Sequence, residues 1–144
     1  MPTRPKSENL GVGRGLWGES VAVDYLRRNG FEIVDRNARP HEKDHRLEID
    51  IVAFERATDT MVFVEVKQHA NLSGYSRRLR SVDRRKRLNL RRACDAWRRA
   101  QKWRGAFRFD VIEVYGVPEG GTAIIDHIPK VNLFVRGERF VKWG

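Results

Sequence analysis

The sequence predicts an α/β fold in which helices flank a mixed central sheet. Two segments, at residues 15–29 and 82–103, have apolar residues at the three- and four-residue spacing of an amphipathic helix. Five shorter segments are rich in β-branched and aromatic residues, as strands are. The predicted order is α-β-β-β-α-β-β, and 144 residues suit one domain of this layered type.

The first helix is predicted at residues 15–29, followed by an outer strand. Gly30 stands where a C-terminal cap belongs. Residues 31–37 alternate apolar and polar side chains, and the charged residues 38–46 form a predicted loop. The stripe of this helix contains Leu16, Glu19, Val23 and Leu26.

The next two strands are predicted at residues 48–52 and 62–67, joined by a hairpin loop at residues 55–60. Residues 69–81 are polar, and we expect a mobile loop there. The second helix follows at residues 82–103, with a buried stripe of Leu90, Ala93, Trp97 and Ala100.

The end of the domain is predicted as two strands, at residues 107–115 and 122–128, joined by a turn. Residues 131–144 are expected to be a C-terminal extension, packed on the domain or folded as a short hairpin. Residues 1–12 are polar with two prolines and are expected to be a disordered tail. The domain is therefore predicted to span residues 13–130.

The charge indicates a polyanionic partner. The chain has 29 Lys+Arg against 19 Asp+Glu, for a formal net charge of +10. Residues 84–104 hold ten basic residues and one acid, Asp95. A solvated helix face is the alternative, but like charges at helical spacing repel one another, and a nucleic-acid backbone would relieve that repulsion. We expect nucleic acid as the partner.

Cysteine usage and hydropathy indicate the compartment. Cys94 is the single cysteine of the sequence, so no intramolecular disulfide can form, and a buried thiol is expected. No apolar run approaches the roughly 20 residues that a membrane-spanning helix needs. We expect no membrane partner and a cytoplasmic location.

The strongest indication of function is a set of charged side chains on the two neighbouring strands. If Phe54 pairs with Met61, then Asp50 lies opposite Glu65, where two like charges are destabilising. A hard cation such as Mg²⁺ or Mn²⁺ would reverse this, with the Val66 carbonyl as a third oxygen ligand. The ammonium of Lys67 would then lie near the attacked phosphate.

Simpler interpretations stay open for several of these residues. Glu48 and Lys67 would also fit a plain cross-strand ion pair, and Glu19 would fit an acid placed near a helix start by the helix dipole. Asp110 is expected to make a structural hydrogen bond or salt bridge. The histidines, which show no metal-ligand spacing, are expected to be surface or loop residues: His41, His45, His69 and His127.

The pattern of Asp50 followed by Glu65-Val66-Lys67 resembles the PD-(D/E)xK nuclease superfamily. More closely, the chain resembles the YraN-like family of uncharacterised bacterial proteins. The matching stretches lie between residues 15 and 128: Gly18-Glu19-Ser20-Val21-Ala22, Tyr25-Leu26, Arg36-Asn37-Ala38-Arg39, Glu48-Ile49-Asp50-Ile51-Val52-Ala53, Val62-Phe63-Val64-Glu65-Val66-Lys67 and Arg108-Phe109-Asp110-Val111.

The resemblance implies a restriction-endonuclease-like fold with an α-β-β-β-α-β core. It implies metal ligation by Asp50 and Glu65, catalysis by Lys67 and assistance from Glu19. Two positions depart from the family pattern: Leu47 replaces a glycine, and His69 replaces a basic residue. By analogy with junction resolvases of this fold, a homodimer is possible.

The expected function is metal-dependent hydrolysis of phosphodiester bonds in DNA, branched or structured DNA included. The first alternative is a nucleic-acid-binding module that keeps the fold without turnover, and a scaffold for a protein partner is another. The residues expected to contact nucleic acid are Arg77, Arg78 and Arg80 in the loop and Arg84, Arg85, Lys86 and Arg91 in the helix.

Overall fold

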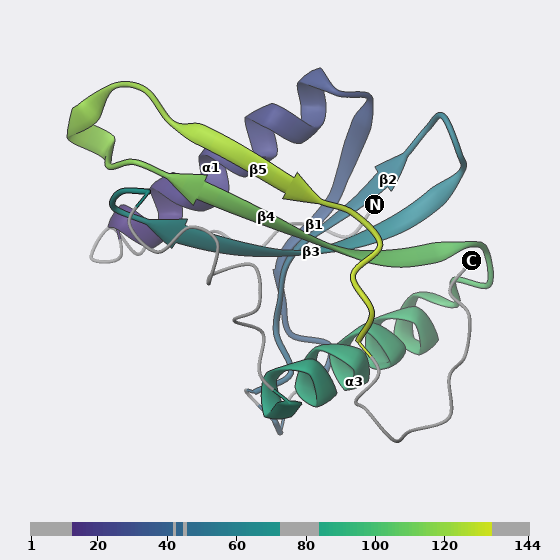
Figure 1. The fold of residues 1–144 in the computed structure, drawn as a ribbon. Coiled ribbons are helices and arrows are strands. Elements are labelled where there is room, and N and C mark those ends of the chain that lie inside the picture. Colours follow the sequence, from purple (N-terminus) through teal and green to yellow (C-terminus); the bar gives the residue numbers. More distant parts are fainter. Residues whose placement is uncertain (1–12, 42, 45, 73–83, 134–144) are drawn as a thin grey trace.

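A five-stranded sheet with one helix on each face forms the body of the molecule (Figure 1). The computed structural model describes residues 13–41, 43–44, 46–72 and 84–133. The elements in chain order are α1 (Gly13–Arg28), β1 (Phe31–Ala38), β2 (Ile49–Glu55), β3 (Thr60–His69), α3 (Arg84–Gln101), β4 (Phe107–Tyr115), the short 3₁₀ helix η2 (Pro118–Gly120) and β5 (Ile124–Ile128).

The sheet is mixed, and its strands lie in sequence order from β1 to β5. β1, β2 and β3 form an antiparallel meander. β4 runs parallel to β3, because α3 carries the chain back across one face of the sheet, and β5 then pairs antiparallel with β4. The expected α/β class and α-β-β-β-α-β order are confirmed.

The core is divided between the two faces of the sheet. On one face, the buried stripe of α1 packs against strand residues such as Ile51 and Val64. On the other face, α3 packs against residues such as Phe63 and Phe109. Alternation along each strand sends consecutive side chains to opposite faces, so both faces of the sheet are supplied from the same apolar runs. The residues that α1 contributes to the core are Ala22, Val23 and Leu26.

The buried stripe of α3 differs from its prediction at one residue. Leu90, Ala93 and Trp97 are buried, but Ala100 is exposed. At 3.6 residues per turn, Ala100 lies about 70° from the centre of the buried stripe. Cys94 is fully buried, as expected, and lies on the opposite edge of the stripe from Ala100.

β1, β2 and β3 end later than predicted, β4 has its predicted bounds, and β5 begins two residues later than predicted. β3 includes His69, which was assigned to the following loop. The chain after β5 packs back on the sheet: the Val131 amide donates to the Phe109 carbonyl at 2.7 Å, and Leu133 is fully buried. The predicted tail (1–12), most of the predicted mobile loop (73–81), the first two residues of the predicted second helix (82–83) and most of the C-terminal extension (134–144) lie outside the described residues.

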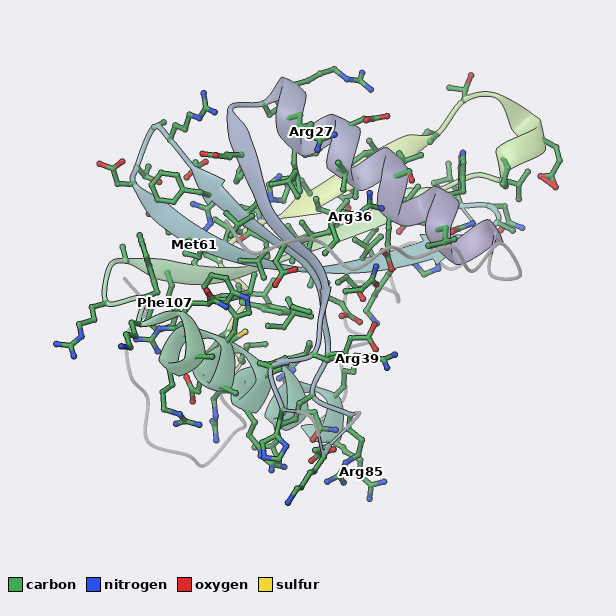
Figure 2. The ribbon with its side chains drawn as sticks, turned by 180° about the vertical axis from the view of Figure 1, so that it is seen from behind. Arg27, Arg36, Arg39, Met61, Arg85 and Phe107 are labelled. Carbon is green, nitrogen blue, oxygen red and sulfur yellow. The ribbon has the colours of Figure 1, made fainter. Side chains whose placement is uncertain are left out.

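The two ends of α3 face different parts of the molecule (Figure 2). Arg85, in its first turn, lies on the same side of the molecule as Arg39, whereas Phe107 lies beyond its last turn, beside Met61. Within the described part of the chain, no helix has the length and apolar character needed to cross a membrane.

Candidate metal centre

The register of the β2–β3 hairpin is the one assumed from the sequence. Phe54 pairs with Met61, and the pairing continues in step to Ile51 and Val64. Beyond that pair, the amide of Val66 donates to Asp50 Oδ2 at 2.8 Å. The Asp50 carboxylate therefore takes the place of a backbone acceptor at the point where the two strands stop pairing.

The backbone of β2 is irregular at Asp50. Ile49 packs in the core beneath α3, whereas Ile51, two residues later, packs in the core beneath α1. Regular alternation would place both side chains on one face. Because the alternation changes at Asp50, its half-buried carboxylate can reach both the Val66 amide and the side chain of Glu65.

The Asp50 and Glu65 carboxyl groups lie within hydrogen-bonding contact of each other. Glu65 is buried, with 7% of its surface exposed. Burial, and then the charge of Glu65, raise the pKa of Asp50 from its ordinary 3.8 to about 8. In the protein alone, Asp50 is therefore protonated at neutral pH and can donate to Glu65. A cation between the two would remove the cause of the shift.

Lys86, in the first turn of α3, contacts the Glu65 carboxylate. Its Nζ lies 3.1 Å from Glu65 Oε2. Burial opposes the charge of Lys86, but Glu65 outweighs burial, and the pKa of Lys86 is raised. The sequence analysis assigned Lys86 to nucleic-acid contact and missed its place in the site. The signal was available, because Lys86 precedes Leu90 by four residues and so lies on the buried stripe of α3.

Lys67 lies two residues beyond Glu65 on β3 and is half-buried. Its partner in the parallel register is Glu113, a carboxylate with 1% of its surface exposed. Glu113 is hydrogen-bonded to the His69 ring. The sequence analysis missed Glu113, although an acid inside the apolar run of residues 107–115 is the same signal that singled out Asp50.

The expectation that the histidines are surface or loop residues is wrong for two of them. His69 lies in β3 against Glu113, and its ring stacks on Tyr115 at 4.9 Å between centroids. His127 lies in β5 and is bonded to Asp110. In both cases a neighbouring strand supplies a buried carboxylate, which the spacing along the chain did not reveal. His41 is exposed, as expected, and His45 lies outside the described residues.

Glu19 approaches the site from α1. Its Oε1 atom is buried and has no hydrogen-bond partner within the described ranges. Burial raises its pKa, against a hydrogen bond with Asn37 and the charge of Arg36, and the charge of Glu65 adds to the rise. α1 begins at Gly13, and its first turn holds no acid. The helix-dipole interpretation of Glu19 is therefore wrong.

Glu48 makes its own ion pair, although its charge also acts on Glu19 and Lys86. Its carboxylate is 3.6 Å from Arg39, and both side chains are partly exposed. Among the salt bridges of the described residues, none joins Glu48 to Lys67. The simple cross-strand ion pair that the sequence also allowed is therefore absent from this part of the chain.

The residues expected to contact nucleic acid differ in their position and exposure. Arg77, Arg78 and Arg80 fall outside the described residues. Arg84 is the first residue of α3. Arg85 is exposed, Arg91 is half-buried, and Lys86 belongs to the carboxylate site.

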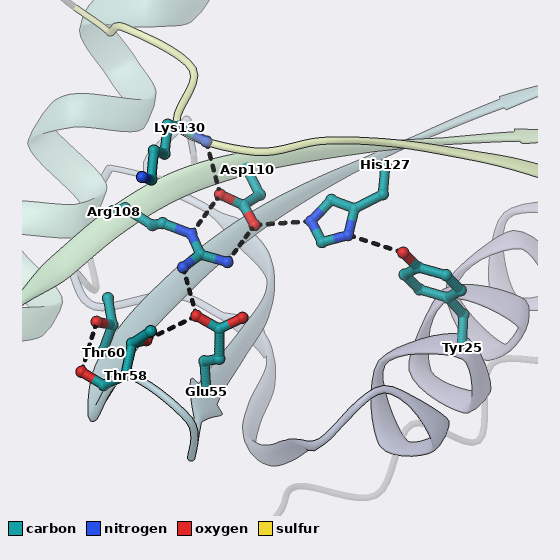
Figure 3. A network of polar contacts seen from close by, with 8 residues as sticks. All are labelled: Tyr25, Glu55, Thr58, Thr60, Arg108, Asp110, His127 and Lys130. Carbon is teal, nitrogen blue, oxygen red and sulfur yellow. Dashed lines mark hydrogen bonds and ion pairs between the residues drawn. The ribbon is translucent and has the colours of Figure 1, made fainter.

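A second polar cluster lies on the α1 side of the sheet (Figure 3). The carboxylate of Asp110 is fully buried and accepts hydrogen bonds from Arg108, from His127 and from the Lys130 amide. Burial opposes its ionisation, but these hydrogen bonds outweigh burial and lower its pKa. Arg108 also reaches Glu55 at 2.6 Å. The structural role expected of Asp110 fits this arrangement.

The donor atoms near Asp50 fit a hard divalent cation. Across the described residues, no group of three His, Cys, Asp or Glu side chains is arranged to hold a metal ion. The available set is instead two carboxylates and a backbone carbonyl, because the carbonyl of Val66 lies on the same edge of β3 as its amide, which faces Asp50. The unpartnered Glu19 Oε1 is a further oxygen in the same region. Mg²⁺ commonly uses one or two carboxylates and takes its remaining ligands from water or substrate.

Comparison with known proteins identifies the family. The model of the uncharacterised protein family UPF0102 matches residues 18–114. A UPF0102 protein of Mycobacterium tuberculosis is 39% identical over 124 residues, which covers 84% of this chain and 93% of the relative. A UPF0102 protein of Syntrophotalea carbinolica is 38% identical over 125 residues, covering 85% and 91%. One from Mycobacterium avium is 42% identical over 102 residues, covering 69% and 75%.

The fold and the carboxylate pair define an α/β protein with a candidate site at the end of a β-hairpin. The chain belongs to the UPF0102 family, which is the YraN-like family that the sequence resembles. The matched region includes every residue of the candidate site.

Proposed function

We propose that this protein is a metal-dependent nuclease that hydrolyses phosphodiester bonds in DNA. The observation that carries the proposal is the contact between the Asp50 and Glu65 carboxyl groups, with Lys67 two residues further along β3. Keeping two carboxyl groups together in a half-buried site is unfavourable without a cation. Such sites are typical of function rather than of packing.

Mg²⁺ or Mn²⁺ is the proposed cofactor, held by Asp50, Glu65 and the carbonyl of Val66. When bound, the cation would polarise the phosphodiester and lower the pKa of water. The Val66 amide fixes the Asp50 carboxylate, since it donates to Oδ2. Glu19 Oε1, which has no hydrogen-bond partner among the described residues, would orient water.

Lys67 supplies the positive charge of the proposed mechanism. The scissile phosphate gains negative charge as water attacks, and a fixed ammonium stabilises that charge more in the transition state than in the ground state. Exposed basic residues such as Arg85 would bind flanking phosphates, supported by the formal net charge of +10. DNA, branched or structured DNA included, is the proposed substrate, and a homodimer is proposed only by analogy.

The test is cleavage of single-stranded, duplex, flapped and junction DNA in the presence of Mn²⁺. Wild-type protein, Asp50→Asn and Glu65→Gln are purified in parallel, with Glu48→Gln as the matched control. Glu48 lies next to β2 and pairs with Arg39, so its variant should lose far less cleavage than Asp50→Asn or Glu65→Gln. Activity in wild type and Glu48→Gln alone supports the proposal. Equal activity in Asp50→Asn would assign the cleavage to a contaminant and refute it.

A nucleic-acid-binding module without turnover is the second candidate function. The contact between Lys86 and Glu65 favours it, because an ammonium already neutralises the buried carboxylate. This candidate predicts salt-sensitive DNA binding. It also predicts no cleavage with any divalent cation, and the same panel of substrates decides between the two.

A further inference from the structure

The first turn of α3 lies against the candidate metal centre. β3 carries Glu65, and the crossover that follows begins α3 at Arg84. Lys86, the third residue of α3, places its Nζ 3.1 Å from Glu65 Oε2. The Lys86 side chain is 48% exposed, whereas that of Glu65 is 9% exposed. The ammonium therefore reaches a buried carboxylate from the solvent side.

This ammonium neutralises a carboxylate that the proposed cation would also use. A buried carboxylate is costly unless a positive group compensates it. Asp50 and Glu48 also lie within electrostatic reach of Lys86. Lys67, which the sequence placed in the site, forms no salt bridge with Glu65 in the described part of the chain. Lys86 is thus the lysine that holds Glu65 in the protein alone.

We propose that Lys86 is an exchangeable counter-ion of Glu65, displaced by a divalent cation and then available to bind the substrate phosphate. The inference rests on the proposed function and adds to it a second lysine, with a different position in each state of the site. Lys86 is a positioning residue in the metal-free protein and a phosphate ligand in the loaded one.

Electrostatic repulsion drives the exchange. An ammonium and a divalent cation sharing Glu65 would lie a few ångströms apart, where like charges repel strongly even in a polar environment. The lysine side chain can respond because it is flexible and half-exposed. A phosphate bound to the cation offers a new negative partner nearby. Cation binding and phosphate binding are therefore coupled through one side chain.

The first test is Mn²⁺ binding by isothermal titration calorimetry, which does not depend on activity. Wild type is compared with Lys86→Met, Lys86→Gln, Lys86→Arg and the neighbouring control Arg85→Met, each checked for folding by circular dichroism. We expect Lys86→Met and Lys86→Gln to bind Mn²⁺ roughly ten-fold more tightly than wild type, because a competing charge is gone. The Mn²⁺ affinity of Lys86→Arg should stay near that of wild type, because arginine keeps the positive charge. The affinity of Arg85→Met should also stay near wild type, because Arg85 is exposed on the same turn and, among the described residues, the salt bridge to Glu65 is made by Lys86.

The outcomes separate this inference from the proposed function. If wild type binds Mn²⁺ and Lys86→Met binds it no more tightly, the exchange is refuted while the nuclease proposal survives. If no variant binds Mn²⁺, both are refuted. If Arg85→Met gains as much affinity as Lys86→Met, the effect is one of net charge, and the exchange is also refuted.

The second test measures the new position of Lys86. The affinity for DNA is measured in two conditions, in the presence of Ca²⁺, which is used to avoid turnover, and in the presence of EDTA. Lys86→Met should lose several-fold more affinity in Ca²⁺ than in EDTA, because only the displaced ammonium contacts phosphate. Arg85→Met should lose the same factor in both. An equal loss for Lys86→Met in the two conditions would refute the transfer to phosphate.

Discussion

The two faces of the sheet each hold buried carboxylates, but in opposite electrostatic settings. On the α1 side, Asp110 accepts hydrogen bonds from Arg108, His127 and the Lys130 amide, and its pKa is lowered (Figure 3). At the end of the hairpin, Asp50 faces Glu65, and its pKa is raised to about 8. A carboxylate with a full set of donors stabilises the fold, whereas one held against another acid does not.

This difference distinguishes a structural cluster from a candidate active site within one small domain. Both groups contain acids inside apolar strands, so their sequence patterns are alike. Their partners differ: Asp110 is matched by cations and amide groups, and Asp50 has one amide and a like charge. Of the two clusters, only the pair of Asp50 and Glu65 would be stabilised by binding a cation from solution.

The largest expected effect is on cleavage. Asp50→Asn should reduce cleavage on the order of a thousand-fold, because one charged ligand of the proposed cation is lost. Initial rates on the best substrate of the DNA panel measure the change. Asp110→Asn, assayed below its melting temperature, should keep most of the activity. A greater loss in Asp110→Asn than in Asp50→Asn would reverse the assignment of the two clusters.

The next largest effect is on stability, and it concerns Asp110. Asp110→Ala should lower the free energy of unfolding by about 3–5 kcal/mol, because Arg108, His127 and the Lys130 amide lose their shared buried acceptor and only Arg108 keeps another, Glu55. Urea unfolding followed by circular dichroism measures this loss. The exposed pair of Arg56 and Glu32 is the control, and Glu32→Gln should cost about 0.5 kcal/mol or less. Similar losses in the two variants would contradict the structural role.

The third prediction is a pH dependence specific to the Asp50 site. The pKa of Asp50 is about 8 in the folded protein against an ordinary 3.8, so the folded state binds the extra proton between these values. The free energy of unfolding therefore falls as pH rises through this window, by at most about 1.4 kcal/mol per pH unit. Asp50→Asn should lose this slope, and Mg²⁺ should reduce it in wild type. An unchanged slope in Asp50→Asn would assign the dependence to other groups.

The smallest predicted effect sharpens the description of the structural cluster. The Tyr25 hydroxyl lies 3.0 Å from His127 Nδ1, and Tyr25→Phe removes this hydrogen bond. The cost should be about 1 kcal/mol of unfolding free energy, with cleavage unchanged. Urea unfolding beside the cleavage assay provides both measurements, and a loss of cleavage without a loss of stability would link the cluster to the active site.

Much of the fold followed from local patterns. The strand at residues 107–115 was predicted at its exact bounds, and the hairpin register of Phe54 with Met61 was correct. Both depend on side-chain alternation and on a short connecting loop, which act between near neighbours in the chain. The interpretation of Glu19 as a helix-start residue failed because α1 begins at Gly13, six residues before Glu19. The position of Glu19 relative to Asn37 depends on how α1 packs on the sheet.

The sequence by itself determined which residues can carry the chemistry: an acid on each of two paired strands and a lysine two residues further on. Tertiary structure alone decided the partner of each group. The crossover into α3 brought Lys86 to Glu65, the parallel pairing of β3 and β4 brought His69 to Glu113, and the irregularity at Asp50 turned its carboxylate toward the Val66 amide. These contacts join segments far apart in the chain or depend on a local break in alternation, so no periodic pattern in the sequence encodes them.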